Sequence, residues 1–203
     1  MTKIDTPSAD LALRERMAAE VPAKMLKHID RVVKLTDRLA RRHHLDVAKA
    51  RLMAQGHDLV RAVEPAELLR RAEARGMAID PVDRGSPVVL HGPIGALELA
   101  ERFDVTDEDV RFAIWWHTPG HPDYTPEAWA MFIADKVDPH KVKRWPALAE
   151  VRELADRSLE EAAVKYLDLR LQESIERGTP VQPMATLTRN ALLRRLGRAG
   201  GEA

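Results

Sequence analysis

The 203-residue sequence contains no cysteine. This absence excludes disulfide bonds and thiolate-ligated zinc, so any metal ion must be held by histidine, aspartate or glutamate side chains and by water. Aromatic residues make up only 4% of the chain, and valine and isoleucine never alternate over the length of a strand. Because alanine, leucine, arginine and glutamate dominate instead, the composition favours an all-α fold.

Long apolar runs and an excess of one charge are also lacking. No apolar run approaches the ~20 residues that cross a membrane, and residues 1–7 lack the apolar core of a signal peptide. We therefore expect a cytoplasmic protein. The 32 basic residues balance 32 acidic ones, so no overall field favours DNA, RNA or a membrane surface as a partner. No P-loop is present either, so phosphates must be held by metal ions and side chains.

Apolar spacing and proline or glycine stops predict helices along most of the chain. Those that matter most span about 23–42, 46–63, 66–75 and 159–177. The segment 80–87 is dense in proline, glycine and aspartate and is interpreted as a loop that borders the site. We find no internal repeat and no low-complexity segment.

Histidine and aspartate side chains recur in or beside the apolar faces of these helices. His28 shares a helical row with Val32, Leu35 and Leu39, where a lone histidine is more often a core residue than a ligand. A buried carboxylate such as Asp135, which follows an aromatic stretch, needs a cationic partner or a metal. Counted together, these residues become candidate metal ligands. The set comprises His28, His57, Asp58, His91, His117 and Asp135.

The order of these residues, H…HD…H…H…D, resembles that of the HD-domain metal-dependent phosphohydrolases. Three segments narrow the resemblance to the bacterial YqeK family of symmetrical bis(5′-nucleosyl)-tetraphosphatases. They are 91–96 (HGPIGA), 116–122 (WHTPGHP) and 134–139 (ADKVDP). The resemblance implies an HD-domain bundle of about seven to nine helices over residues 23–196. Residues 1–22 would form an N-terminal helical extension and residues 197–203 a flexible tail, and a homodimer is possible, as family members tend to form one.

The resemblance also implies that the six candidate residues form a metal centre. Four imidazoles and two carboxylates are too many for one ion that keeps a position open for substrate, so two ions fit better. The two expected groups share Asp58 as the bridging ligand and otherwise comprise His28, His57 and Asp135 near one ion, and His91 and His117 near the other. Family members use iron, and this nitrogen-rich set suits iron, manganese or zinc.

Two metal ions ~3.5–4 Å apart are typical of phosphoester and phosphoanhydride hydrolysis. The resemblance narrows the expected reaction to symmetrical cleavage of diadenosine tetraphosphate into two ADP by a bridging, metal-activated hydroxide. Asp58 and Arg61 are the expected catalytic residues, and Arg61 would neutralise the attacked phosphate where the family usually has lysine. Arg61, His121 and Arg189 are expected to hold the polyphosphate.

Other functions stay open from the sequence. The same ligands would serve an HD phosphohydrolase with another nucleotide substrate. A non-catalytic metal or nucleotide sensor is a second alternative, because Arg61, Met184 and Ala185 replace the lysine, aspartate and threonine common in the family. A plain helical interaction protein would require the six matching residues to be a coincidence.

Overall fold

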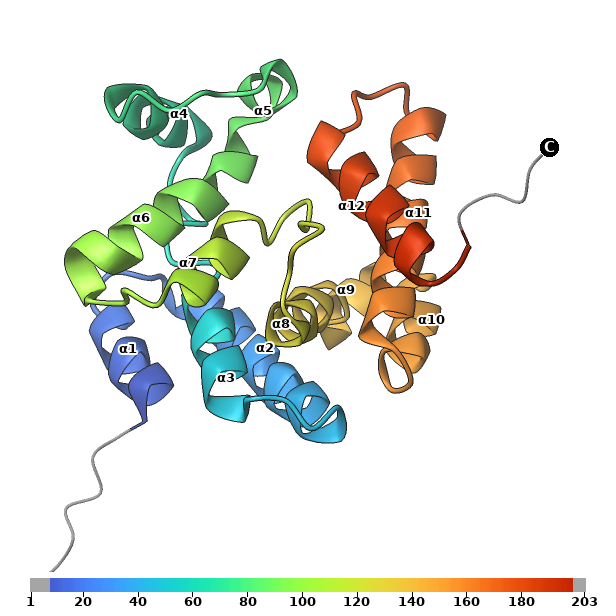
Figure 1. Cartoon of the computed structure of the whole chain (residues 1–203). Coiled ribbons are helices and arrows are strands. Elements are labelled where there is room, and N and C mark those ends of the chain that lie inside the picture. The colour runs from blue at the N-terminus through green and yellow to red at the C-terminus, as the bar shows by residue number, and fades with distance from the viewer. Residues whose placement is uncertain (1–7, 199–203) are drawn as a thin grey trace, which may run out of the picture.

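The computed structural model describes residues 8–198, within which the chain forms twelve α-helices, one 3₁₀ helix and no β-strand (Figure 1). The all-α prediction is confirmed, but the helices are more numerous than the seven to nine expected. Residues 1–7 of the expected N-terminal extension and 199–203 of the expected tail lie outside the described residues. The helices are α1 (Ala9–Met17), α2 (Ala23–Arg42), α3 (Val47–Gly56), α4 (Pro65–Ala74), α5 (Pro81–Gly85), η1 (Pro87–Leu90), α6 (His91–Phe103), α7 (Glu108–Trp115), α8 (Pro126–Lys136), α9 (Pro139–Arg144), α10 (Leu148–Ala155), α11 (Leu159–Glu176) and α12 (Pro183–Arg195).

Local capping chemistry explains where many of these helices begin. The side chains of Asp46, Thr125 and Ser158 each accept a hydrogen bond from a backbone N–H in the first turn of α3, α8 and α11. Proline stands in the first turn of α4, α5, α8, α9 and α12, where its missing N–H costs no intrahelical hydrogen bond. The predicted spans 23–42 and 159–177 agree with α2 and α11 to within a residue.

The predicted helix over 46–63 is wrong beyond Gly56. There α3 ends and the chain continues in hydrogen-bonded turns, with Leu59 N bonded to Gly56 O and Arg61 N to Asp58 O. Gly56 lies directly against the side chains of α6 and α7: a Cβ atom at this position would come within 2.7 Å of Leu99 Cδ1. The helix therefore ends where it meets its neighbours, which helix propensity alone does not reveal.

The predicted loop over 80–87 is also wrong in part, because α5 and η1 occupy most of it. Each of these short helices begins at a proline, and the Asp80 carboxylate accepts a hydrogen bond from Val82 N at the start of α5. The same proline and aspartate residues that mark turns also begin helices, so composition does not separate the two.

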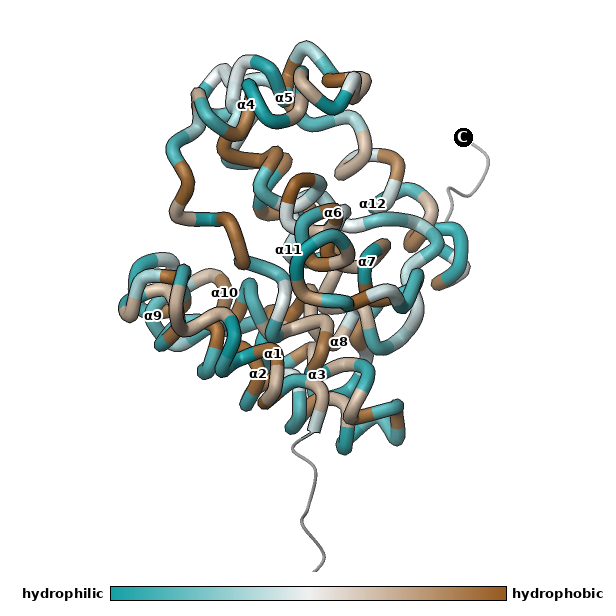
Figure 2. The backbone as a smooth tube through the Cα atoms, turned by 90° about the vertical axis from the view of Figure 1, so that its left-hand side faces the viewer, coloured by the Kyte–Doolittle hydropathy of each residue, from teal (hydrophilic) through white to brown (hydrophobic). Residues whose placement is uncertain are grey.

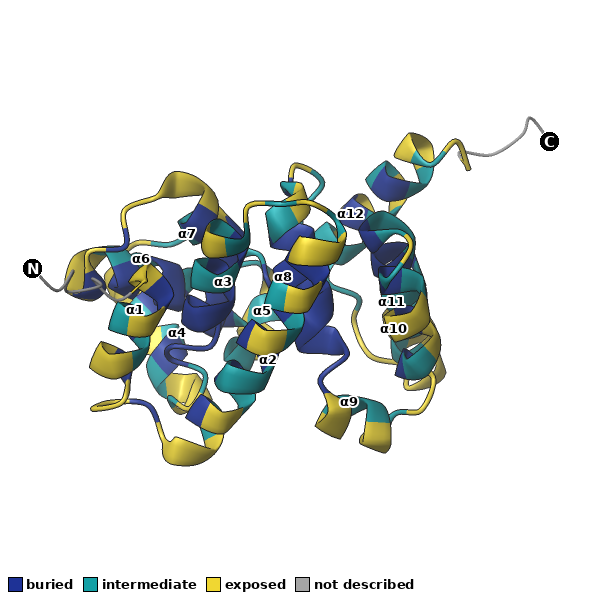
Figure 3. Ribbon diagram, turned by 90° about the horizontal axis from the view of Figure 1, so that it is seen from below, coloured by how far each residue is buried: buried dark blue, intermediate teal, exposed yellow. Residues whose placement is uncertain are grey.

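Helix α8 lies at the centre of the molecule. All its residues from 128 to 136 are buried, between α2 and α3 on one side and α11 on the other (Figure 3). Along the surrounding helices hydrophobic and hydrophilic residues interchange, so each helix can turn one side to the core (Figure 2). Leu13 and Met17 of α1 belong to the same core. None of the helices within residues 8–198 combines the length and hydropathy that a membrane crossing needs.

We predict that Gly56→Ala destabilises the protein. The new methyl group would lie 2.7 Å from Leu99 Cδ1 and 2.9 Å from Ile114 Cδ1, and both side chains are fully buried. Overpacking of this kind costs about 1–3 kcal/mol, measurable as a lower urea midpoint. Gly85→Ala is the matched control, since no atom lies within 4 Å of the added Cβ. Equal stability of both variants would contradict the close packing at Gly56.

Candidate functional site

The six residues singled out in the sequence lie together, and five of them come from or next to helix ends. His28 is on α2, and Asp135 is the penultimate residue of α8. His57 and Asp58 lie directly after α3. His91 is the first residue of α6, and His117 follows α7 by two residues. Tertiary packing thus brings together side chains that are up to 107 positions apart in the sequence.

Asp58 stands between two groups of histidines. Its Oδ2 atom lies 3.5 Å from His28 Nε2 and 3.4 Å from His57 Nε2. Its Oδ1 atom lies 3.2 Å from His91 Nε2 and 3.6 Å from His117 Nε2. Within each group the ligand atoms lie within 4.8 Å of one another. One carboxylate therefore presents a separate oxygen to each pair of imidazoles.

Asp135 lies beside the first of these groups. Its Oδ1 atom is 3.2 Å from His28 Nε2 and 3.6 Å from His57 Nε2. It also forms ion pairs with Lys136, at 2.8 Å, and Lys141. Burial alone would raise the pKa of the Asp135 carboxyl, but the two lysines outweigh it and hold that pKa well below its usual value. Asp135 is thus a charged carboxylate whose Oδ1 atom faces both the histidines and Lys141, while its Oδ2 atom pairs with Lys136.

The four histidines share one orientation. Each Nδ1 atom faces an oxygen that can only accept, so in the neutral ring Nδ1 carries the hydrogen and Nε2 holds the lone pair. The acceptors are Asp138 Oδ2 for His28, Ala54 O for His57, Val88 O for His91 and Ile114 O for His117. The Nε2 atoms all face the carboxylates of the cluster. This arrangement of an outer acceptor, an imidazole and an inner lone pair is typical of metal-ligating histidines.

The polar atoms of the cluster are poorly satisfied by one another. His57 Nε2 is fully buried and has no hydrogen-bond partner within residues 8–198. His91 Nε2 and His117 Nε2 lie only 2.8 Å apart. Two lone pairs at this distance repel unless a cation or a proton lies between them. Two nitrogen ligands at right angles, each at about 2.0–2.1 Å from one ion, are about 3 Å apart, so the pair fits a shared metal.

The electrostatics of the cluster also favour positive charge. Burial disfavours the charged form of His57, yet the carboxylates of Asp58 and Asp135 outweigh it and raise the pKa of His57 to about 10. Burial, and then the neighbouring imidazoles, lower the pKa of His117 to about 4, so this ring stays neutral at pH 7. The field that favours a cation on His57 also favours a metal ion, and a neutral His117 is ready to ligate. The residues present fit two metal ions.

Three contributors were missed by sequence reasoning. Asp138, which was not among the candidate residues, is buried, accepts from His28 Nδ1 at 2.6 Å and pairs with Arg31. Lys136 and Lys141 hold the charge of Asp135, and Lys136 also donates to His117 O at 2.9 Å. Asp138 and Lys136 belong to the 134–139 segment that carries the family resemblance, which was the available signal.

The three expected phosphate contacts lie in different surroundings. Arg61 is partly exposed in the turn that follows Asp58, and its side chain forms no ion pair or hydrogen bond with the described part of the chain. Arg189 lines a cavity and pairs with Asp168. His121 packs against Phe112 and Trp116, with ring centroids 4.7 and 5.2 Å away, and is not among the residues that line this cavity.

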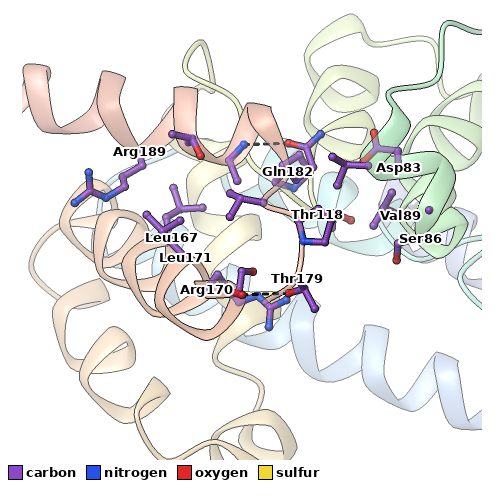
Figure 4. Close-up of a pocket in the computed structure, with 18 of the residues that line it drawn as sticks. Asp83, Ser86, Val89, Thr118, Leu167, Arg170, Leu171, Thr179, Gln182 and Arg189 are labelled. Carbon is purple, nitrogen blue, oxygen red and sulfur yellow. Dashed lines mark hydrogen bonds between the residues drawn. The ribbon is translucent and has the colours of Figure 1, made fainter. Parts of the chain in front are cut away.

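The cavity of about 520 Å³ adjoins the cluster through Lys136, which lines it and contacts Asp135. Its walls come from α5 and η1 on one side and from α11 and α12 on the other (Figure 4). The segment 80–87 borders it, as expected. The turn before α12 and the first turns of α12 also line it, including Ala185 of α12, one of the two positions that depart from the family pattern. Ligand pockets commonly have volumes of about 300–1,000 Å³.

Comparison with known proteins gives three consistent matches. The HD domain family matches residues 25–140. The symmetrical bis(5′-nucleosyl)-tetraphosphatase of Bacillus subtilis (strain 168) is 30% identical over 76% of this chain and 82% of its own length. The protein of the same name from Halalkalibacterium halodurans is 29% identical over 76% and 81%.

A solved structure is similar over nearly the whole chain. The crystal structure of a predicted HD superfamily hydrolase involved in NAD metabolism from Clostridium acetobutylicum matches with a TM-score of 0.83 and 25% identity. The match covers 90% of this chain and 96% of that one.

We predict that Asp138→Asn weakens metal binding about 10- to 100-fold, because His28 loses the carboxylate that orients its ring. Metal affinity, measured by competition with a chelator, checks this. Asp30→Asn removes a carboxylate that also pairs with an arginine, Arg14, but lies outside the cluster. The metal affinity of the Asp30→Asn variant should match that of the unmodified protein. Equal affinities of all three proteins would contradict the role of Asp138.

We predict that variants of the two histidine groups differ in bound metal. His91→Ala removes a ligand from one group and should reduce the metal content from two ions per chain to about one. Asp58→Ala removes the residue common to both groups and should remove both ions. Elemental analysis after gel filtration gives the ratio, and circular dichroism establishes that each variant is folded. Loss of both ions in His91→Ala would contradict two separable groups.

Proposed function

From the premise that this chain belongs to the HD domain family and is an HD-type phosphohydrolase, we propose that it cleaves diadenosine tetraphosphate symmetrically into two ADP. The observation that carries the proposal is the position of Asp58, whose two oxygens face two separate pairs of histidines. The relatives named as symmetrical bis(5′-nucleosyl)-tetraphosphatases support the choice of substrate.

The proposed ligands of the first ion are His28, His57, Asp58 and Asp135. Those of the second are Asp58, His91 and His117. Bound divalent ions supply Lewis-acid activation of water and of a phosphate oxygen. The oxygen and nitrogen donors suit iron, manganese or zinc.

The protein's own residues prepare the site for an anionic substrate. Lys136 and Lys141 keep Asp135 ionised although it is buried. The outer acceptors fix the four imidazole rings, so little reorganisation is needed when the ligands act. Arg61 follows Asp58 by one turn of backbone and makes no ion pair within residues 8–198. Its guanidinium is therefore available to neutralise a phosphate, with the bidentate geometry that arginine offers.

The cavity beside Lys136 supports a substrate that extends away from the cluster. A volume of about 520 Å³ is in the range of nucleotide-sized ligands. Arg189 contributes a positive charge to its wall. We propose that one half of the substrate occupies this cavity while its phosphates reach the Asp58 cluster.

A second candidate is an HD phosphohydrolase with a different nucleotide substrate. The similar solved structure is described as involved in NAD metabolism, and Met184 and Ala185 depart from the family pattern in the segment that borders the cavity. The ligand cluster would serve such a reaction equally well, because it contacts phosphate rather than the base.

The test is anaerobic incubation of the iron-reconstituted protein with diadenosine tetraphosphate, followed by chromatographic separation of the nucleotides. We expect two ADP per substrate, and loss of this activity in Asp58→Ala, which lacks the carboxylate common to both histidine groups. Asp123→Ala is the control, since this side chain is 85% exposed and should retain full activity. AMP plus ATP as products would reject symmetrical cleavage. No product despite bound metal would reject this substrate.

A further inference from the structure

One wall of the cavity carries a carboxylate that the metal centre does not use. Asp83 lies on α5, and its Oδ1 atom is buried without a hydrogen-bond partner among the described residues. It lines the cavity opposite α11 and α12 (Figure 4). Burying an acceptor without a partner costs free energy. A ligand that donates a hydrogen bond at this point would compensate the cost.

The neighbouring groups meet this need only in part: the Gln182 side chain hydrogen-bonds the Asp83 carboxyl, which leaves the Oδ1 atom without a partner among residues 8–198. Asp80 bears the same charge, and its carboxylate is engaged with Val82 N at 2.8 Å. Burial and then Asp80 raise the pKa of the Asp83 carboxyl, and the Gln182 side chain only partly offsets this. Gln182 Oε1 accepts from Ala185 N at 3.1 Å at the start of α12. The cations of the cavity are already paired: Arg189 with Asp168 and Arg170 with Glu173.

The charge distribution along the cavity indicates how a nucleotide lies in it. A carboxylate repels phosphate, so the polyphosphate cannot face Asp83. Lys136, which joins the cavity to the Asp58 cluster, marks the end for the phosphates. Val89, Leu167 and Leu171 supply apolar surface for a nucleobase (Figure 4). The part of a nucleotide that both tolerates a carboxylate and donates to it is the nucleoside.

We propose that Asp83 is a specificity-determining residue that accepts hydrogen bonds from the nucleoside of the bound nucleotide. The donors are either the two ribose hydroxyls or the amino group of adenine. Both are neutral groups that suit a carboxylate. This inference rests on the proposed function, in that it takes ADP, the expected product, as the occupant of the cavity.

The test is calorimetric titration of the metal-loaded protein with ADP and, separately, with inorganic tripolyphosphate. Asp83→Asn should weaken ADP binding about tenfold or more, as expected for loss of a charged hydrogen-bond acceptor. Tripolyphosphate affinity should change less than twofold, because it has no nucleoside. Asp80→Asn is the matched control: it removes the same charge three residues away, keeps a capping side chain and does not line the cavity.

Two further nucleotides identify the donor. If the ribose hydroxyls donate, 2′-deoxy-ADP should bind the unmodified protein more weakly than ADP does and lose little more in Asp83→Asn. If the adenine amino group donates, inosine diphosphate, which lacks this group, should bind the unmodified protein more weakly than ADP does. Its affinity should then fall little further in Asp83→Asn. Either pattern supports the inference, and thermal unfolding of each variant establishes that it is folded.

Equal ADP affinity of the unmodified protein and Asp83→Asn would overturn the inference, as would an equal loss for tripolyphosphate or for Asp80→Asn. These results are separable from the proposed reaction. ADP binding that depends on Asp83 without cleavage of diadenosine tetraphosphate would reject the reaction and retain the nucleoside contact. Cleavage with unchanged ADP affinity in Asp83→Asn would reject the contact alone.

Discussion

The burial of the Asp58 carboxylate is the constraint on which the site depends. A buried anion is tolerated only where positive charge or donors surround it, and here four imidazole Nε2 atoms face its two oxygens at 3.2–3.6 Å, an arrangement that suits bound cations. These imidazoles come from α2, the end of α3, the start of α6 and the turn after α7. The helices must therefore meet at one place for the cluster to exist. Packing of these helices into the core therefore also brings the site residues together.

A second layer of contacts gives the cluster its rigidity. The backbone carbonyls of Ala54, Val88 and Ile114 fix three rings, and Asp138 fixes the fourth. Three of these acceptors lie three residues before the histidine that they orient, so a local turn sets the ring. Lys136 joins the cluster to the cavity, since its ammonium group contacts Asp135 and His117 O and the residue also lines the cavity. The candidate metal cluster and the cavity are thus adjacent through a single side chain.

The cavity has a cationic residue, Lys136, and an anionic residue, Asp83, in different parts of its lining, as a nucleotide has a charged phosphate part and a neutral nucleoside part. The end at Lys136 suits phosphates, and the Asp83 carboxylate, whose Oδ1 atom has no hydrogen-bond partner within residues 8–198, suits neutral donors. Gln182, just before α12, and Ala185, within it, also line the cavity. The differences from the family pattern at Met184 and Ala185 therefore lie at or beside the wall of the cavity and not among the candidate metal ligands.

The sequence by itself determined the helical class, the spans of α2 and α11 and the identity of the six clustered residues, because apolar spacing and the order of the histidines and aspartates are visible along the chain. Tertiary structure decided the rest. Gly56, where α3 ends, lies against Leu99 and Ile114, and Asp138 orients His28 across 110 positions of sequence. The Oδ1 atom of Asp83 has no hydrogen-bond partner among residues 8–198, at a cavity that both α5 and α12 line. Each of these depends on which distant side chains come into contact, and the local pattern carries no information on that.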